Sequence, residues 1–146
     1  MAELRVVGEL PLSVSAERAW ELWSRVEDWP RWDWVGSADA RWLQGEPWTE
    51  GARLRVGHRP RTFDAVLVVV DPPREVTTQA RGLGIGGRHT YRFLSRGNGC
   101  VFRMEETFHG RGARLLKPLV RWYWGRQMLA FRRFAEAADS TVDGRD

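Results

Sequence analysis

Three polar side chains that could carry acid–base chemistry fall in phase with apolar residues on predicted strands: His58, His89 and Glu106. The segment Arg88–Leu94 alternates, with its histidine, tyrosine and phenylalanine in one phase and its polar residues in the other. The segment Cys100–Phe108 alternates in the same way, with its glutamate among the apolar set. Because successive strand residues point to opposite faces, this parity predicts that all three polar side chains face the protein interior.

The turn Ser95–Gly99 is typical of a hairpin and sets the register of the strands on either side. If Leu94 pairs with Val101, then His89 lies opposite Glu106, with Cβ atoms about 5 Å apart. A histidine and a carboxylate at this separation could move a proton in an aldol-type cyclisation or a dehydration. They could also form a self-satisfied buried contact, or orient a ligand without turnover. A slip of one residue would instead turn the glutamate outward.

Near the end of the chain, Ala113–Ala138 carries apolar residues at intervals of three and four, which predicts a helix about 35–40 Å long. Because Pro118 interrupts the pattern, we expect the regular helix to begin near Lys117. Gly125 would relieve crowding against a sheet or a ligand. The middle of the helix is predicted to form one wall of a cavity, through Tyr123, Gln127, Met128 and Phe131.

The rest of the chain reads as a strand over Glu3–Leu12, a helix over Ala16–Arg25 capped by Ser15, and a short helix capped by Asp28. Six strands follow up to about His109, with a glycine-rich loop predicted at residues 82–87. The fold class is therefore α+β, in the order β-αα-β6-α, with one domain over residues 1–139 and a polar tail over 140–146.

Composition narrows the possible functions. The chain has 146 residues, a formal net charge of +4 and one cysteine, Cys100, so no internal disulfide is expected and a cytoplasmic location is favoured. The basic residues are spread along the chain, which argues against a nucleic-acid-binding patch. We expect no metal, no cofactor and no integral membrane segment. Nine tryptophans favour a large core or an apolar pocket.

Five stretches of the sequence resemble the START-like (SRPBCC) superfamily, and within it the polyketide cyclase/dehydrase group: Val14–Trp23, Asp28–Trp32, Gly51–Leu54, Val70–Arg74 and Leu115–Arg133. The resemblance covers essentially the whole chain. It implies a helix-grip fold, in which a seven-stranded curved antiparallel sheet wraps around a long C-terminal helix. The shared residues are architectural, so no catalytic residue is carried over.

The resemblance also implies an internal cavity that binds lipids, polyketides or other hydrophobic small molecules, and such binding is our leading expectation. One alternative is a polyketide aromatase/cyclase-type enzyme with His89 and Glu106 as its acid–base groups. Another is a protein-interaction module of the co-chaperone type, which an exposed apolar patch would favour. The oligomeric state stays open. The residues expected to contact the ligand are Trp32, Trp42, His58, Phe63, Tyr91, Phe102, Met104, Tyr123, Gln127, Met128 and Phe131.

Overall fold

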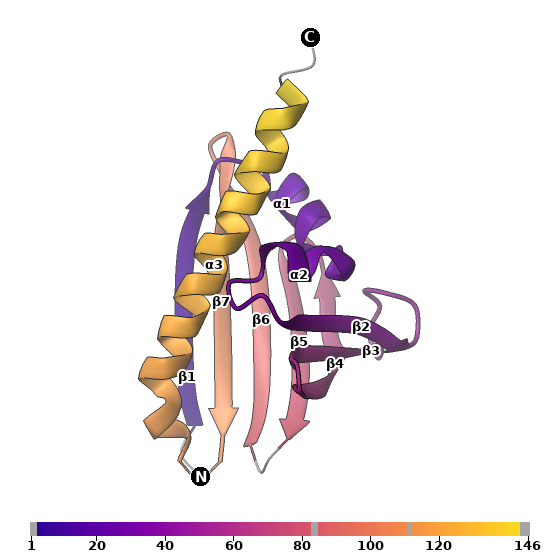
Figure 1. Cartoon of the computed structure of the whole chain (residues 1–146), viewed down its shortest axis with the longest axis vertical. Helices are drawn as coiled ribbons and strands as arrows, with labels where there is room; N and C mark the ends of the chain where they lie inside the picture. Colours follow the sequence, from indigo (N-terminus) through magenta and orange to yellow (C-terminus); the bar gives the residue numbers. More distant parts are fainter. Residues whose placement is uncertain (1–2, 83–84, 111, 144–146) are drawn as a thin grey trace.

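The computed structural model describes residues 3–82, 85–110 and 112–143. Its strands form one antiparallel sheet in the order β1-β7-β6-β5-β4-β3-β2, which confirms the predicted helix-grip fold (Figure 1). The strands are β1 (Glu3–Leu12), β2 (Ala38–Gln44), β3 (Arg53–His58), β4 (Arg61–Asp71), β5 (Glu75–Gly82), β6 (Ile85–Arg96) and β7 (Gly99–His109). The predicted glycine loop is shorter than expected, because pairing of Gly82 with Ile85 extends both strands into it.

One long helix and a group of short ones cover a single face of the sheet. The helices are α1 (Ala16–Trp23), the 3-10 turn η1 (Val26–Asp28), α2 (Trp29–Trp32) and α3 (Ala113–Asp143). Figure 1 shows α3 crossing the sheet obliquely, with α1 and α2 beside its second half and its middle. An antiparallel sheet with one apolar face requires this kind of cover.

The start of α1 agrees with the sequence prediction, whereas the start of α2 does not. The Ser15 hydroxyl accepts a hydrogen bond from the Arg18 backbone N–H at 3.1 Å, as a helix cap should. The Asp28 carboxylate makes no capping bond and instead accepts one from the Arg31 guanidinium at 3.2 Å. Because the 3-10 turn η1 directly precedes this four-residue helix, few free N–H groups remain to be capped at its start.

Helix α3 is longer at both ends than the sequence suggested. It begins at Ala113 instead of near Lys117, and Pro118 lies inside it. The proline removes one hydrogen bond to the carbonyl of Arg114, in an exposed first part of the helix where water can take its place. At the other end α3 continues to Asp143, so residues 140–143 of the predicted tail are helical and residues 144–146 lie outside the described part.

Gly125 does not relieve crowding, contrary to the sequence expectation. It is exposed, and a Cβ atom built on it meets nothing within 4 Å. We therefore expect Gly125→Ala to raise the free energy of unfolding by about 0.5–1 kcal/mol, because alanine restricts the unfolded chain and favours the helix. Chemical denaturation would measure this. Gly112→Ala is the contrasting variant, since Gly112 has φ +82° and alanine should destabilise it. Loss of stability in Gly125→Ala would contradict the prediction.

The hydrophobic core fills only part of the space between α3 and the sheet. Its centre is Trp23 on α1, whose ring lies 5.1 Å from the rings of both Phe102 and Phe131. Phe131 belongs to the second half of α3, and both phenylalanines are fully buried. A second, smaller cluster joins Leu4, Val6 and Ala113 at the beginning of α3. Between these two clusters the inner face of α3 borders a cavity.

Candidate functional site

The cavity has a volume of about 600 Å³ and lies between the first half of α3, the short helix α2 and the inner face of β2 to β7. Most of its wall is apolar or aromatic, and six of the nine tryptophans contribute to it: Trp23, Trp29, Trp32, Trp48, Trp122 and Trp124. This size is within the usual range for small-molecule sites, which combine apolar walls with a few placed polar groups.

Eight of the residues singled out from the sequence lie on the cavity wall, and five do not. The wall includes Trp32, His58, Phe63, His89, Tyr91, Glu106, Tyr123 and Gln127. The expected ligand contacts Phe102, Met104, Met128 and Phe131 are instead packed in the core around Trp23. All four side chains are buried, as expected, but Phe102 and Phe131 pack against Trp23 of α1, and Met128 packs over Gly8 of β1.

Trp42 is the fifth expected ligand contact that does not line the cavity. Its ring packs edge to face against the ring of Trp48, with 5.1 Å between centroids. Trp48, in the connection between β2 and β3, is the residue of this pair that reaches the cavity. Trp34, in the connection between α2 and β2, is 42% exposed and packs against Trp122.

The predicted register of His89 and Glu106 is confirmed, because the two residues pair directly across β6 and β7. They do not hydrogen-bond to each other. The Trp124 indole N–H donates to the Glu106 carboxylate, while His89 Nδ1 lies 3.3 Å from the Tyr91 hydroxyl. The His89 ring stacks on Tyr91 at 4.2 Å and meets the edge of Trp124 at 4.4 Å. Trp124, which sequence reasoning missed, therefore contacts both members of the pair.

Burial favours the uncharged form of both Glu106 and His89. Desolvation raises the pKa of Glu106 to about 7, and the hydrogen bond from Trp124 only partly opposes it. Desolvation also lowers the pKa of His89 to about 3, so that this imidazole is neutral near pH 7. Its Nε2 atom is buried and has no hydrogen-bond partner among the residues that the structure describes.

A second polar cluster, centred on Asp33, was not predicted from the sequence. Its carboxylate is only 2% exposed and accepts hydrogen bonds from the backbone N–H groups of Ser37 and Ala38, both at 3.1 Å. The Gln127 amide also donates to it, and His58 Nδ1 lies 3.5 Å away. The available signal was an aspartate directly after a short helix, where such side chains commonly accept bonds from nearby backbone.

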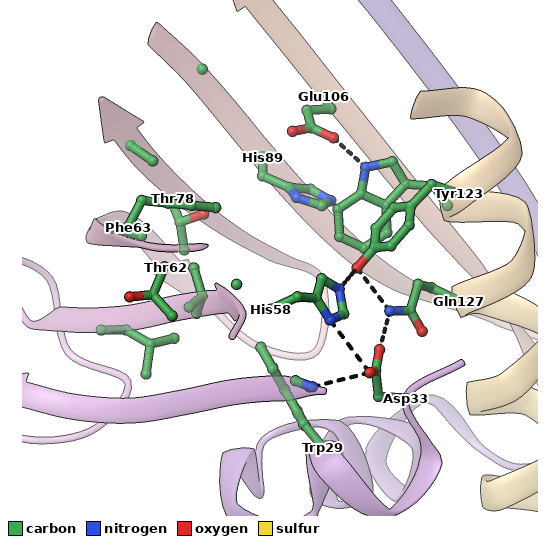
Figure 2. A pocket seen from close by; sticks show the side chains of 18 of the residues that line it. Trp29, Asp33, His58, Thr62, Phe63, Thr78, His89, Glu106, Tyr123 and Gln127 are labelled. Carbon is green, nitrogen blue, oxygen red and sulfur yellow. Dashed lines mark hydrogen bonds and ion pairs between the residues drawn. The ribbon is translucent and has the colours of Figure 1, made fainter. Parts of the chain in front are cut away.

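Tyr123 joins the second cluster to the cavity. Its hydroxyl is hydrogen-bonded to His58 Nε2 and accepts a bond from the Gln127 amide at 2.8 Å. Burial raises the pKa of Tyr123 to about 12, so the phenol keeps its proton. Figure 2 shows Asp33, His58, Tyr123 and Gln127 converging below the pair formed by His89 and Glu106.

Two hydrogen-bonding clusters thus reach the cavity through adjacent residues of α3, Tyr123 and Trp124. Together they can pair with oxygen or nitrogen atoms on an otherwise apolar ligand. The residues within the described ranges contain no group of three or more His, Cys, Asp or Glu side chains that could hold a metal ion.

Comparison with known proteins agrees with this architecture. The family model described as polyketide cyclase / dehydrase and lipid transport matches residues 3–138. No curated protein matches the sequence significantly. Among solved structures, a norcoclaurine synthase point mutant from Thalictrum flavum in complex with a transition state analogue is similar, with a TM-score of 0.73 and 16% identity. That alignment covers 94% of this chain and 97% of the other.

Two further solved structures share the fold. A protein from Mesorhizobium loti has a TM-score of 0.76 and 14% identity, and the match covers 92% of this chain and 98% of the other. A putative protein of a dynemicin biosynthetic locus has a TM-score of 0.75 and 15% identity, covering 92% of this chain and 48% of the other. Because the family model spans nearly the whole sequence, the chain belongs to the polyketide cyclase / dehydrase and lipid transport family.

Proposed function

We propose that this protein binds a hydrophobic small molecule, such as a lipid or a polyketide, in the cavity between α3 and the sheet. The observation that carries the proposal is the cavity itself, which has a volume of about 600 Å³ and a largely apolar wall. A folded protein gains stability by filling such a space with side chains, so a large apolar cavity is usually kept for a ligand. The description of the family, which includes lipid transport, is consistent with this function.

The polar groups on the cavity wall favour a ligand that carries hydrogen-bonding atoms at more than one place. Glu106 lies at one point of the wall, and Tyr123 with His58 lies at another. Three acidic residues line the cavity, Asp33, Asp39 and Glu106, against one arginine, Arg61, so the acidic side chains would oppose a ligand carboxylate placed beside them. A neutral molecule with hydroxyl or carbonyl oxygens therefore suits the cavity better than an anion does.

We expect Ala80→Phe to weaken ligand binding, because Ala80 lies on β5 with its side chain on the cavity wall. A phenyl ring there would occupy the ligand's space, and affinity should fall by about tenfold or more. The measurement is titration with N-phenyl-1-naphthylamine, a neutral fluorescent probe, at unchanged thermal stability. Native mass spectrometry of the purified protein would reveal any ligand that is retained.

The control variant for this experiment is Ala137→Phe, which adds the same ring at an exposed position of α3. It should bind the probe as well as the unmodified protein does. Equal probe affinity in Ala80→Phe and Ala137→Phe would mean that the probe binds elsewhere, and would remove the support for a ligand in this cavity.

A second candidate function is acid–base catalysis of the cyclase or dehydratase type, with Glu106 and His89 as the reacting groups. The observation in its favour is the direct pairing of His89 and Glu106 on the cavity wall, where burial raises the pKa of Glu106 to about 7. A carboxyl group with this pKa can both donate and accept a proton near neutral pH. Incubation with a poly-β-ketone substrate, followed by product analysis, would test turnover. Tight binding without any product would leave the binding function alone.

A further inference from the structure

The first half of α3 presents three large apolar side chains to solvent: Leu115, Leu119 and Trp122, which are 84%, 58% and 50% exposed. Their spacing of four and three residues places them within about 60° of one another around the helix axis. Trp34 extends this strip, since its ring packs edge to face on that of Trp122 with 4.9 Å between centroids. We call these four residues the apolar strip.

Basic side chains accompany the strip, and acidic ones are missing from the same stretch of sequence. Arg114 and Arg121 are exposed on α3 and lie roughly 100–130° to one side of the strip, whereas the exposed Lys117 lies nearly opposite it. The Arg126 guanidinium carbon lies 5.8 Å from the centre of the Trp34 ring. The sequence contains no aspartate or glutamate from position 113 to position 135. The surface is therefore apolar in the middle and positively charged at its border.

The strip is continuous with the cavity. Leu119 and Trp122 line the cavity with one part of their side chains, although both are at least half exposed. Phe63 on β4 also lines the cavity and is 45% exposed. An apolar path thus leads from the cavity wall to the outer surface of α3.

We propose that the apolar strip docks this protein onto an anionic lipid bilayer. In this arrangement Leu115, Leu119 and Trp122 enter the boundary between headgroups and acyl chains, while the flanking basic residues contact lipid phosphates. Leucine and tryptophan beside arginine and lysine are the side chains that interfacial helices use. The contact is peripheral, since no helix in the described part of the chain is long and apolar enough to cross a membrane.

The charge pattern favours a lipid surface over a protein partner. A basic border without acidic residues complements a surface that is uniformly negative, as an anionic membrane is. Combined with the proposed ligand-binding function, docking would place the part of the cavity wall formed by Leu119 and Trp122 at the bilayer, so that a hydrophobic ligand could pass without crossing water. Docking itself requires no ligand and can be tested separately.

Flotation with phosphatidylcholine vesicles, with and without phosphatidylglycerol, tests the proposal. We expect the protein to float with the anionic vesicles, to bind neutral ones much more weakly, and to be released as salt is raised. Arg114→Glu/Arg121→Glu should weaken the partitioning by at least about fivefold for each basic residue removed. Arg41→Glu/Arg96→Glu is the matched control, with the same change of net charge at exposed positions on other elements.

A second pair of variants separates the apolar contribution from the charge. Leu115→Asp should abolish flotation, whereas Leu43→Asp, at an exposed leucine of β2 that is 40% accessible, should not. Leu115 does not line the cavity, so Leu115→Asp should still bind N-phenyl-1-naphthylamine in solution. Retained probe binding with lost flotation supports the docking surface, and loss of probe binding would count against the cavity function instead.

Two results would overturn the docking proposal. The first is absence of flotation by the unmodified protein with anionic vesicles at low salt. The second is a dimer, or a complex with another protein, that Leu115→Asp dissociates while vesicle binding is unaffected. In that case the strip would be a protein interface.

Discussion

Glu106→Gln is expected to raise the free energy of unfolding by about 3 kcal/mol at about pH 8, and to leave it nearly unchanged at about pH 4.5. The reason is that burial raises the pKa of Glu106 from 4.5 to about 7 in the folded protein. Each pH unit of such a difference corresponds to about 1.4 kcal/mol. Glutamine has nearly the same shape, and its amide oxygen can accept the hydrogen bond that Trp124 now donates to the carboxylate.

The sign follows from counting protons in the two states. Between about pH 4.5 and pH 7 the folded protein keeps the proton on Glu106, whereas the unfolded chain has lost it. Because the folded state then binds more protons, this group makes stability fall as pH rises through that window. Above about pH 7 the ionised Glu106 carboxylate lowers the free energy of unfolding by its full amount, which no longer changes with pH. Urea denaturation of both proteins at a series of pH values would measure it.

Glu105→Gln is the matched control, because the neighbouring glutamate should behave in the opposite way. The Glu105 carboxylate is 2.8 Å from the Arg5 guanidinium, and the hydrogen bond from Arg5 lowers its pKa. Its stabilising contribution is present above its unfolded pKa and is lost as pH falls through the folded value. Removing that carboxylate should therefore destabilise the protein at neutral pH. If Glu106→Gln lowered stability at about pH 8, as Glu105→Gln should, the raised pKa of Glu106 would be wrong.

The protonation state of Glu106 also affects which ligands the cavity binds. Below about pH 7 the Glu106 carboxyl group is neutral and can donate a hydrogen bond to a ligand oxygen. Above that pH it becomes a carboxylate on a mostly apolar wall, which an uncharged ligand would have to desolvate. A neutral ligand should therefore bind more tightly on the acidic side of pH 7, whether or not it is then converted.

The sequence predicts the fold, and which strand residues point inward, because both depend on patterns that repeat every two to four residues. Alternation along Arg88–Leu94 and the hairpin turn at Ser95–Gly99 were enough to pair His89 with Glu106. Strand parity distinguishes the inner face of the sheet from the outer one, but it does not tell which inward positions are filled. Phe102 and Tyr91 have equal parity, yet only Tyr91 reaches the cavity, because the rings of Phe93 and Phe131 pack against Phe102 as well as that of Trp23.

The parts of the site that sequence reasoning missed depend on contacts between segments far apart in the chain. Asp33 is joined to Gln127, 94 residues later, and Glu106 to Trp124, 18 residues later. Neither bond follows from a local pattern, since each requires the position of α3 over the sheet. Gly125 and Pro118 were misjudged for the opposite reason, because local propensity was given too much weight. Gly125 meets no crowding, and Pro118 lies within the helix without ending it.

His89→Phe is expected to remove the contribution by which the His89 imidazole lowers stability in acid, which amounts to about 3 kcal/mol between about pH 6.5 and pH 4. Burial lowers the pKa of His89 from 6.5 to about 3, so in this window the unfolded chain takes up a proton that the folded protein does not. Stability from this group therefore rises with pH up to about 6.5 and is constant above it. Phenylalanine keeps the ring contacts with Tyr91 and Trp124 but does not titrate.

Tyr91→Phe provides the control for this variant, because it removes the same Tyr91–His89 hydrogen bond while leaving the imidazole in place. It should lower stability by a similar amount at every pH, about 1 kcal/mol, without changing the slope. Between about pH 4.5 and pH 6.5 the slopes due to His89 and Glu106 have opposite signs and cancel in the unmodified protein. Each single variant should therefore uncover the slope of the other group, and a flat profile in both would contradict the burial of these two side chains at the cavity wall.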